Sequence, residues 1–413
     1  MANPSSGLIP TVLPTSNWAD PSCLANAPVL PVEITPAGGT AHYFNIVTSS
    51  DGITWIPQEV GNPELSNPSA TFNGVEWSPF LGFYISSYDD GTGGSGLIFS
   101  TDGITWIPQA TTFDTLGAIP ISFIWIAEWD CFFSFLFSGA VYKSFDGITW
   151  TSVSCPVTPL NGAREMAWSP ELGMLWVAGH GSDGSVSGAS TTDVGVTWTE
   201  QRCDGIINLF GIAWSSNLHQ WVVAGRGEDL SFTTLTLAYS SDGATWHKVT
   251  QNPFEFIGAP PFTASSGLAV TWSSFLGLWL AFGYSAFGSA TSSDGISWAS
   301  HDFTARYAEW SSDLNRFVAV TNSSVVYTST DGSSWESNPI EHLILADNFD
   351  GTDIVWSSEL HQFVMVGSGI YHDPSAVPLT SSFCANAGIG TFDPPTVSGI
   401  DPTLPPTYYF EPH

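Results

Sequence analysis

Two short phrases alternate along most of this chain, and both have the hydrophobic pattern of β-strands. One is Trp-Ser followed by apolar and aromatic residues, as in "VEWSPFLGFYIS" over 75–86. The other is Ser-x-Asp-Gly-x-Thr-Trp, as in Ser49 to Trp55. Apolar residues recur at every second position, for example Val75 and Trp77, which is typical of half-buried strands. The Gly, Asn and Asp residues between the phrases predict tight turns, so we expect short antiparallel strands throughout.

The Asp-Gly phrase occurs seven times, and its spacing indicates a repeat architecture. Successive motif aspartates lie 37 to 52 residues apart, which is the period of a four-stranded propeller blade. We expect a structural role for these residues: the aspartate bonds turn amides, glycine supplies positive φ, and tryptophan packs between sheets. The motif residues are Asp51, Asp102, Asp146, Asp193, Asp242, Asp294 and Asp331, with Trp55, Trp106, Trp150, Trp198, Trp246, Trp298 and Trp335.

The two ends of the repeat region predict how the ring closes. Residues 42–59 resemble the second half of a repeat, and residues 353–368 resemble the first half. We therefore expect an all-β, seven-bladed β-propeller with four-stranded blades, in which the N-terminal strands complete the C-terminal blade. Such closure removes an open sheet edge. The predicted organisation is an extended arm over 1–41, the propeller over 42–368, and an extended Pro-rich arm over 369–413.

The repeats resemble the bacterial neuraminidase repeat, or Asp-box, of sialidase-type propellers. That pattern, Ser/Thr-x-Asp-x-Gly-x-Thr-Trp, lies on the turn between the third and fourth strands of a blade. Residues Thr191 to Trp198 match it in full, and the other six copies lack one residue between Asp and Gly. The repeat phrasing is also similar to that of propellers encoded among virion structural genes of tailed phages. The resemblance implies a propeller fold and a virion setting.

Charge and composition exclude several classes of partner. The chain has 7 Lys and Arg against 38 Asp and Glu, a formal net charge of −31. This field repels phosphate backbones and anionic headgroups, so we expect no nucleic-acid binding and no membrane insertion. The start of the chain has neither the basic nor the apolar segment of a secretory signal, so none is expected. The cysteines show no zinc spacing. No cofactor or metal site is predicted, although a bound cation such as calcium stays open.

No catalytic residue is assigned. A sialidase grips its substrate carboxylate with three arginines, because planar guanidinium forks suit that anion. This chain has five arginines in all and lacks the family's Arg-Ile-Pro motif. Three glutamates, Glu76, Glu128 and Glu309, precede a Trp that we assign to the innermost strand of its repeat. They would meet at the centre, where they could bind a cation or share a proton. We favour the alternative, that each is solvated or hydrogen-bonded within its own blade.

Variable connections predict a recognition face. Links between the second and third strands, and between successive blades, fall on one face, and a rigid scaffold with variable loops is typical of binding proteins. Aromatic faces and carboxylates there would suit sugar rings; alternatively, these are ordinary loops with solubilising charges. The candidate binding residues are Tyr88, Asp89, Asp90, His180, Asp183, Arg226, Glu228, Asp229, Phe254, Phe256, Tyr284 and Phe287.

The favoured hypothesis is a non-enzymatic structural protein of the virion surface. It would be a capsid decoration or a tail or fibre component that presents the propeller for host attachment, by carbohydrate binding to cell-surface glycan. Its terminal arms would bind other virion proteins. Two alternatives stay open. One is a glycoside hydrolase or polysaccharide-degrading propeller of non-sialidase type, and the other is a cytoplasmic protein-interaction scaffold.

The cysteines carry a separate prediction. Cys155 and Cys203 each follow a motif Trp by five residues. Equal positions on adjacent outer strands are splayed apart, whereas a disulfide needs Cα atoms within about 7 Å. We therefore expect both thiols unpaired, and Cys131 reduced as well. Cys23 and Cys384 lie in the two arms within similar phrases, which suggests a bridge between them.

Overall fold

The structure is a computed structural model, and its described residues form β-strands joined by turns and links. The labelled exceptions are two 3-10 helices, η3 (Thr112–Thr115) and η4 (Ala127–Trp129). No helix among the described residues has the length and apolar character needed to cross a membrane. The structure describes 42–372 except 59, 61–64, 66, 68, 116–118, 137, 156–164, 180–185, 204–205, 228–234, 251–252, 255–268, 284–287, 322 and 341–348.

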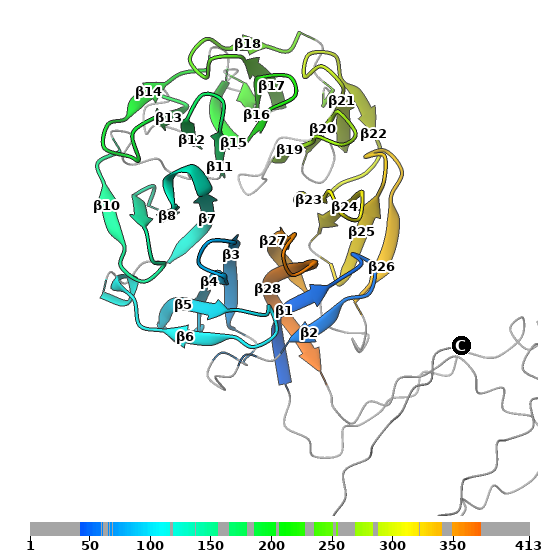
Figure 1. The fold of residues 1–413 in the computed structure, drawn as a ribbon. Coiled ribbons are helices and arrows are strands. Elements are labelled where there is room, and N and C mark those ends of the chain that lie inside the picture. The colour runs from blue at the N-terminus through cyan, green and yellow to red at the C-terminus, as the bar shows by residue number, and fades with distance from the viewer. Residues whose placement is uncertain are drawn as a thin grey trace, which may run out of the picture. The chain divides into compact units, whose positions relative to one another are not determined.

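Five of the sheets are separate and four-stranded, and we number them blades two to six. Each is an antiparallel meander that begins with its innermost strand (Figure 1). Blade two holds β7 (Pro120–Ile126), β8 (Cys131–Leu136), β9 (Val141–Ser144) and β10 (Thr151–Val153); blade three holds β11 (Glu165–Ser169), β12 (Met174–Ala178), β13 (Gly188–Thr191) and β14 (Thr199–Gln201). Blade four holds β15 (Ile206–Ser215), β16 (Gln220–Gly227), β17 (Leu235–Ser240) and β18 (His247–Lys248); blade five holds β19 (Ala269–Ser273), β20 (Leu278–Phe282), β21 (Ser289–Ser292) and β22 (Ala299–His301); blade six holds β23 (Tyr307–Ser311), β24 (Arg316–Val320), β25 (Val325–Ser329) and β26 (Glu336–Pro339).

The remaining strands form one eight-stranded sheet, which consists of two four-stranded sets. The sets join at a single residue pair, Ser368 with Thr71. Five blades are therefore separate sheets, and the other two four-stranded sets of the expected seven-bladed propeller share one sheet. Strand β28 (Gln362–His372) also continues past the predicted boundary at residue 368. We call the sets blade one, with β3 (Thr71–Ser78), β4 (Phe83–Asp89), β5 (Ser95–Ser100) and β6 (Ile107–Gln109), and blade seven, with β27 (Asp350–Ser357), β28 (Gln362–His372), β1 (His42–Ser49) and β2 (Ile56–Gln58).

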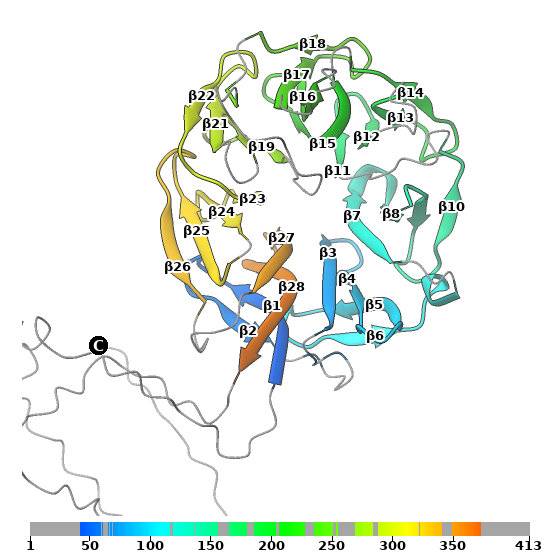
Figure 2. The ribbon, with the colours of Figure 1, turned by 180° about the vertical axis from the view of Figure 1, so that it is seen from behind.

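The ring closes as predicted, through strands from the two ends of the propeller. Strand β1 pairs antiparallel with β28 from His42 opposite His372 to Ser49 opposite Phe363, with one irregularity. Strand β2 continues the same sheet outward by pairing with β1. Blade seven thus takes its inner strands from the C-terminal part and its outer strands from the N-terminal part (Figures 1 and 2).

Hydrophobic clusters between neighbouring blades hold the ring together. One cluster joins Phe210 and Val222 of blade four to Trp279 and Trp298 of blade five, all of them buried. In these clusters the side chains pack across the gap between two sheets, as period-2 alternation requires. Each blade therefore depends on both of its neighbours for a buried face.

The first turn of each blade is capped by a buried serine, except in blade two. Ser78, for example, accepts the amide N–H of Leu81 through its hydroxyl at 3.1 Å. Blade two has Ile126 at this position and forms η4 instead. Its inner-strand tryptophan is Trp125, whose ring lies 4.8 Å from that of Phe132. The sequence analysis assigned Trp129, the residue after Glu128, to this position, which was wrong by four residues. The segment "WIAEW" contains two tryptophans, and either one fits the strand pattern of the repeat.

The three described cysteines are buried core residues. Cys155 is 4% exposed and Cys203 is 0% exposed, and they belong to different clusters. Two other repeats also have a core residue five positions after the motif Trp. Phe303 follows Trp298 and packs between blades five and six, and Ile340 follows Trp335 and packs between blades six and seven. The structure forms no disulfide among Cys131, Cys155 and Cys203. Cys23 and Cys384 lie outside the described residues, as do the predicted arm over 1–41 and residues 373–413. Residues 369–372, which were expected in the C-terminal arm, belong to β28 instead.

Closure predicts a sharp difference between two N-terminal deletions. Removing residues 1–60 deletes β1 and β2 and exposes the edge of β28, so we expect loss of cooperative folding. Removing only residues 1–41 leaves both strands in place and serves as the control. Circular dichroism and thermal unfolding would compare them. A deletion of residues 1–60 that melts like the full chain would refute the role of closure.

Candidate functional site

Each of the repeated Asp-Gly turns is stabilised by hydrogen bonds between its own side chains and its own backbone. In blade seven the Asp51 carboxylate accepts the amide N–H groups of Ile53 and Thr54, each at 2.7 Å. The Ser49 hydroxyl donates to that carboxylate and accepts the Gly52 amide N–H at 2.8 Å. The same set of bonds recurs at Asp102, Asp146, Asp242, Asp294 and Asp331.

Electrostatics agree with this structural role. Burial alone would raise the pKa of Asp51, but the hydrogen bonds from the Ile53 and Thr54 amides and from the Ser49 and Thr54 side chains together hold the pKa below its usual range. In blade three Val194 is the additional residue, and there the hydroxyl of Thr197 donates to Asp193 at 2.6 Å. That bond is the largest cause of an Asp193 pKa of about 2. All seven motif aspartates have lowered pKa values and are committed to turns.

Each motif turn also packs closely against the neighbouring blade. Gly52 has φ +73°, and a Cβ at that position would lie 3.0 Å from Val318 of blade six. The indole N–H of Trp55 donates to the Gly52 carbonyl at 3.1 Å. Glycine and tryptophan therefore serve packing rather than ligand binding here.

Among the predicted loop residues, Tyr88, Asp89 and Asp90 lie together at the link between β4 and β5. Asp89 accepts the amide N–H of Gly91 at 2.8 Å. Asp90 accepts the amide N–H groups of Thr92 and Gly94, and these bonds lower its pKa. Tyr88 is half-buried, with its ring 6.2 Å from that of Phe72. The two carboxylates thus shape this loop, and any ligand contact by them stays a prediction.

The other predicted loop residues divide into two groups. Phe254 is 2% exposed and belongs to the core beside Trp298, so the expectation of a solvent-facing ring is corrected. Its position soon after a motif Trp is a core position, which explains the burial. The backbone of Arg226 lies in β16, opposite Asn208. Outside the described residues lie the Arg226 side chain and His180, Asp183, Glu228, Asp229, Phe256, Tyr284 and Phe287.

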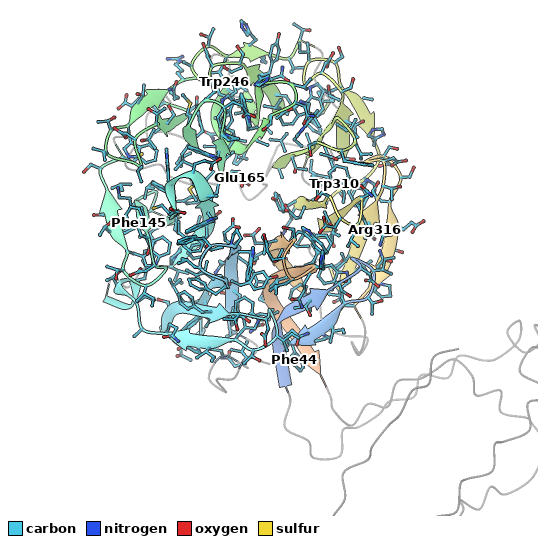
Figure 3. All side chains as sticks on the ribbon, viewed as in Figure 1. Phe44, Phe145, Glu165, Trp246, Trp310 and Arg316 are labelled. Carbon is cyan, nitrogen blue, oxygen red and sulfur yellow. The ribbon has the colours of Figure 1, made fainter. Side chains whose placement is uncertain are left out.

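Four carboxylates gather on the innermost strands around the central axis. Glu76 lies on β3 and Glu309 on β23, both directly before an inner-strand Trp, as predicted. Glu165 on β11 and Asp353 on β27 lie two positions earlier on the same strand face. Figure 3 shows Glu165 directed toward the centre of the ring. Each of the four is half-buried.

Two of these axial carboxylates were missed from sequence, and one predicted member is absent. Glu128 lies in η4 and is exposed, because Trp125 rather than Trp129 is the inner-strand tryptophan. The axial position in blade two is therefore Ile124. Glu165 and Asp353 could have been found by extending the strand alternation two residues toward the N-terminus.

Backbone amides occupy several of the axial oxygens. Asp353 accepts the amide N–H of Val75 from blade one at 2.9 Å and that of Ile354 at 2.9 Å. Innermost strands have one unpaired edge, so an acceptor from the next blade satisfies a donor that the sheet leaves open. Among the described residues no group of three or more His, Cys, Asp or Glu could hold a metal ion.

Burial raises the pKa of every axial carboxylate. Burial is the largest cause in each, and it brings the pKa of Glu309 to about 8 and that of Asp353 to about 6. The pKa values of Glu76 and Glu165 are raised well above the usual range, with repulsion between the carboxylates adding to burial. The Tyr307 hydroxyl donates to Glu309 at 3.1 Å. Glu309 therefore keeps its proton near neutral pH, whereas Asp353 loses its proton at a lower pH.

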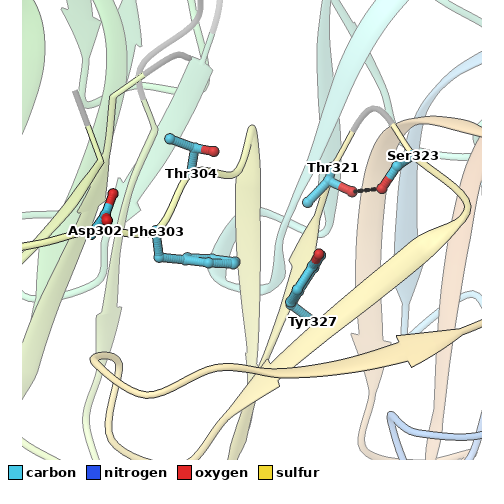
Figure 4. Close-up of a pocket in the computed structure, with 6 residues that line it drawn as sticks. All are labelled: Asp302, Phe303, Thr304, Thr321, Ser323 and Tyr327. Atoms are coloured by element: carbon cyan, nitrogen blue, oxygen red, sulfur yellow. Dashed lines mark hydrogen bonds between the residues drawn. The ribbon is translucent and has the colours of Figure 1, made fainter. Parts of the chain in front are cut away.

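A pocket of about 310 Å³ opens between blades five and six (Figure 4). Asp302, Phe303 and Thr304, from the link between β22 and β23, lie on one side, and Thr321, Ser323 and Tyr327 lie on the other. The Phe303 and Tyr327 rings meet edge to face at 5.2 Å. The lining thus combines two aromatic rings, several hydroxyl groups and one carboxylate.

The pocket lies on the face of the variable links, where recognition was expected, but its residues were not among the candidates. Phe303 and Tyr327 have counterparts in blade two, Phe113 and Tyr142, with ring centroids 5.1 Å apart. A tyrosine four residues before the motif aspartate occurs only in these two repeats. That irregularity is the signal that sequence comparison could have used.

The two sets of carboxylates predict opposite pH effects on stability. Axial groups have raised pKa values, so as pH rises from about 4.5 to about 8 the unfolded state loses protons first and stability falls. Motif aspartates have lowered pKa values, so their contribution is lost as pH falls from about 4 toward about 2. We expect maximum thermal stability at about pH 4 to 5, measured by calorimetry across pH.

Glu309→Gln is the matched control for this profile. The introduced amide keeps an acceptor for the Tyr307 hydroxyl but cannot ionise. The variant should flatten the decline above about pH 6, by up to roughly 1 kcal/mol per pH unit. Parallel curves for the two proteins would contradict the axial assignment.

Comparison with known proteins does not assign this chain to a family. No protein-family model and no curated protein matches the chain. Among solved structures, a YCF48 from Cyanidioschyzon merolae is 14% identical with TM-score 0.49, covering 75% of this chain and 97% of that one. YCF48 bound to a D1 peptide is 14% identical with TM-score 0.48, covering 74% and 92%. The GH74 enzyme of Niastella koreensis is 13% identical with TM-score 0.32, covering 70% and 49%. At these scores the propeller assignment rests on the strand pairing described above.

Proposed function

We propose that this protein is a non-enzymatic, carbohydrate-binding propeller, and that the pocket between blades five and six holds the sugar. The pocket is the observation that carries the proposal. Its volume of about 310 Å³ is at the lower end of the roughly 300–1,000 Å³ usual for small-ligand sites. One terminal sugar residue suits that volume better than a long chain does.

The chemistry of the lining supports a neutral sugar. Aromatic rings such as Tyr327 present an apolar face with a polar tip, which matches the C–H face and hydroxyl rim of a pyranose. The Asp302 carboxylate is an acceptor-only group, so it suits sugar hydroxyl donors and disfavours anionic sugars. The Thr321 hydroxyl lies 2.8 Å from that of Ser323 and bonds the Val325 carbonyl at 3.0 Å. That arrangement fixes one polar wall.

The proposed setting is the surface of a virus particle, with attachment to host glycan as the role. Support comes from the repeat phrasing, which resembles propellers encoded beside virion structural genes, and from the net charge of −31. Strong like charge keeps densely displayed copies from adhering to one another. The terminal arms would bind neighbouring virion proteins. Immunogold labelling of source particles would test this placement directly.

Two substitutions test the pocket by glycan-array binding and isothermal titration. Tyr327→Leu removes the aromatic face, and Asp302→Asn removes the charge while conserving shape. Each should weaken binding of the best neutral sugar roughly tenfold, since one stacking contact is worth on the order of 1 kcal/mol or more. Tyr142→Leu, at the equivalent position in blade two, is the control and should change affinity less than about twofold.

The outcomes separate binding at this pocket from general effects. Equal losses for Tyr327→Leu and Tyr142→Leu would place the site elsewhere. A wild-type protein that binds no glycan would refute the carbohydrate proposal as a whole.

A glycoside hydrolase is the second candidate, favoured by the axial Glu309. Its pKa of about 8 keeps a proton available near neutral pH, as a general acid requires. Under the binding proposal, incubation with neutral and acidic polysaccharides should release no reducing sugar and no sialic acid. Turnover that Glu309→Gln abolishes would replace the binding proposal with the hydrolase.

A further inference from the structure

The exposed apolar side chains gather at the turn ends of the strands. Among the described residues thirteen large hydrophobic side chains are exposed, and all lie in the two kinds of turn or at the start of an outermost strand. Ten of them come from four consecutive blades. We call these ten the apolar arc: Ile53, Ile56 and Leu360 of blade seven; Phe80, Ile104 and Ile107 of blade one; Phe145 and Ile148 of blade two; and Leu172 and Val196 of blade three.

The arc is not required by the turns themselves. Ile104 is 51% exposed and Ile148 is 45% exposed, while their backbone amides make the turn bonds. Blade six has Ser333 at the same position, and its amide N–H still donates to the motif aspartate at 2.8 Å. A polar residue thus serves the turn equally well. Scattered exposed apolar residues are ordinary, but a concentration on one face marks an interaction surface.

Acidic groups alternate with the apolar ones along the arc. Asp51, Asp102, Asp146 and Asp193 each lie within two or three residues of an arc member, and lowered pKa values keep them ionised. Two nearby cations are already engaged with turn carbonyls. The Lys143 ammonium donates to the Val194 carbonyl at 2.7 Å, and the Arg316 guanidinium donates to the Asp51 carbonyl at 2.7 Å. The arc is therefore apolar and negative.

We propose that the apolar arc docks a protein partner whose contact surface combines apolar side chains with lysine or arginine. Charge complementarity selects this occupant. A second copy would bring another net charge of −31 to the interface. The chain's own ends offer no complement, because residues 1–41 and 373–413 contain no Lys or Arg. The arc lies at the opposite ends of the strands from the pocket, so a bound partner leaves the pocket face open.

Serine substitutions test the arc without changing its charge. The variants are Ile104→Ser and Ile148→Ser, singly and together, and Ile296→Ser of blade five is the matched control outside the arc. The probe is a synthetic amphipathic helix with leucine on one face and lysine along both flanks; a second helix carries glutamate in place of lysine. Fluorescence anisotropy at two salt concentrations measures binding.

We expect wild type to bind the lysine helix more weakly as salt rises, and the double variant to bind roughly tenfold more weakly than wild type. Ile296→Ser should stay within about twofold of wild type. No binding by wild type, equal binding of both helices, or unchanged affinity in the double variant would overturn the proposal. Sedimentation tests the second copy as occupant. A wild-type dimer that the double variant dissociates would overturn the basic partner in favour of self-association.

Discussion

The antiparallel pairing of β1 with β28 is the contact on which the rest of the structure depends. A propeller blade buries its two faces against its neighbours, so an open ring would leave one face and one sheet edge unsatisfied on each side of the gap. Here the last gap is filled by strands from opposite ends of the propeller. Trp55, carried by the N-terminal strands, is 0% exposed and packs with Phe363 of β28. Closure therefore completes a core as well as a sheet.

Closure also brings inner strands to a common axis, and that explains the two behaviours of acidic side chains. At the turn ends a carboxylate meets several amide donors and much water, so ionisation is favoured. At the axis, burial outweighs the amide hydrogen bonds that a carboxylate such as Asp353 accepts, so its pKa rises to about 6. Ionised carboxylates thus stabilise the turns, whereas ionisation of a carboxyl group at the axis is unfavourable.

The local sequence pattern was sufficient to predict the strands of the blades. It failed where one segment fitted the repeat in two registers, and where a feature depends on residues far apart in the sequence. Alternation placed Glu76 and Glu309 at the axis, but "WIAEW" fitted the repeat in two registers, and only packing of Trp125 on Phe132 decides between them. Phe254 lies in a segment with the composition of a loop, yet its side chain packs in the core beside Trp298. The pocket joins a link from one blade to a loop of the next. Neither segment predicts it alone, because its shape depends on the angle between two sheets.

The two proposed surfaces follow from one feature of propeller geometry. Turns between the first and second strands and between the third and fourth are short, and they are similar in all blades except the first turn of blade two and the motif turn of blade three. They can therefore build a repeated, extended surface suited to a protein partner. Links at the other ends differ between blades, and one pair of them can form a single small pocket without altering the rest. The motif turn fixes its backbone through aspartate and serine, which frees the following residue to be isoleucine in blade one or serine in blade six. Blades that share one fold can therefore differ in what they bind, since the residues that hold the ring and the residues that face outward are separate sets.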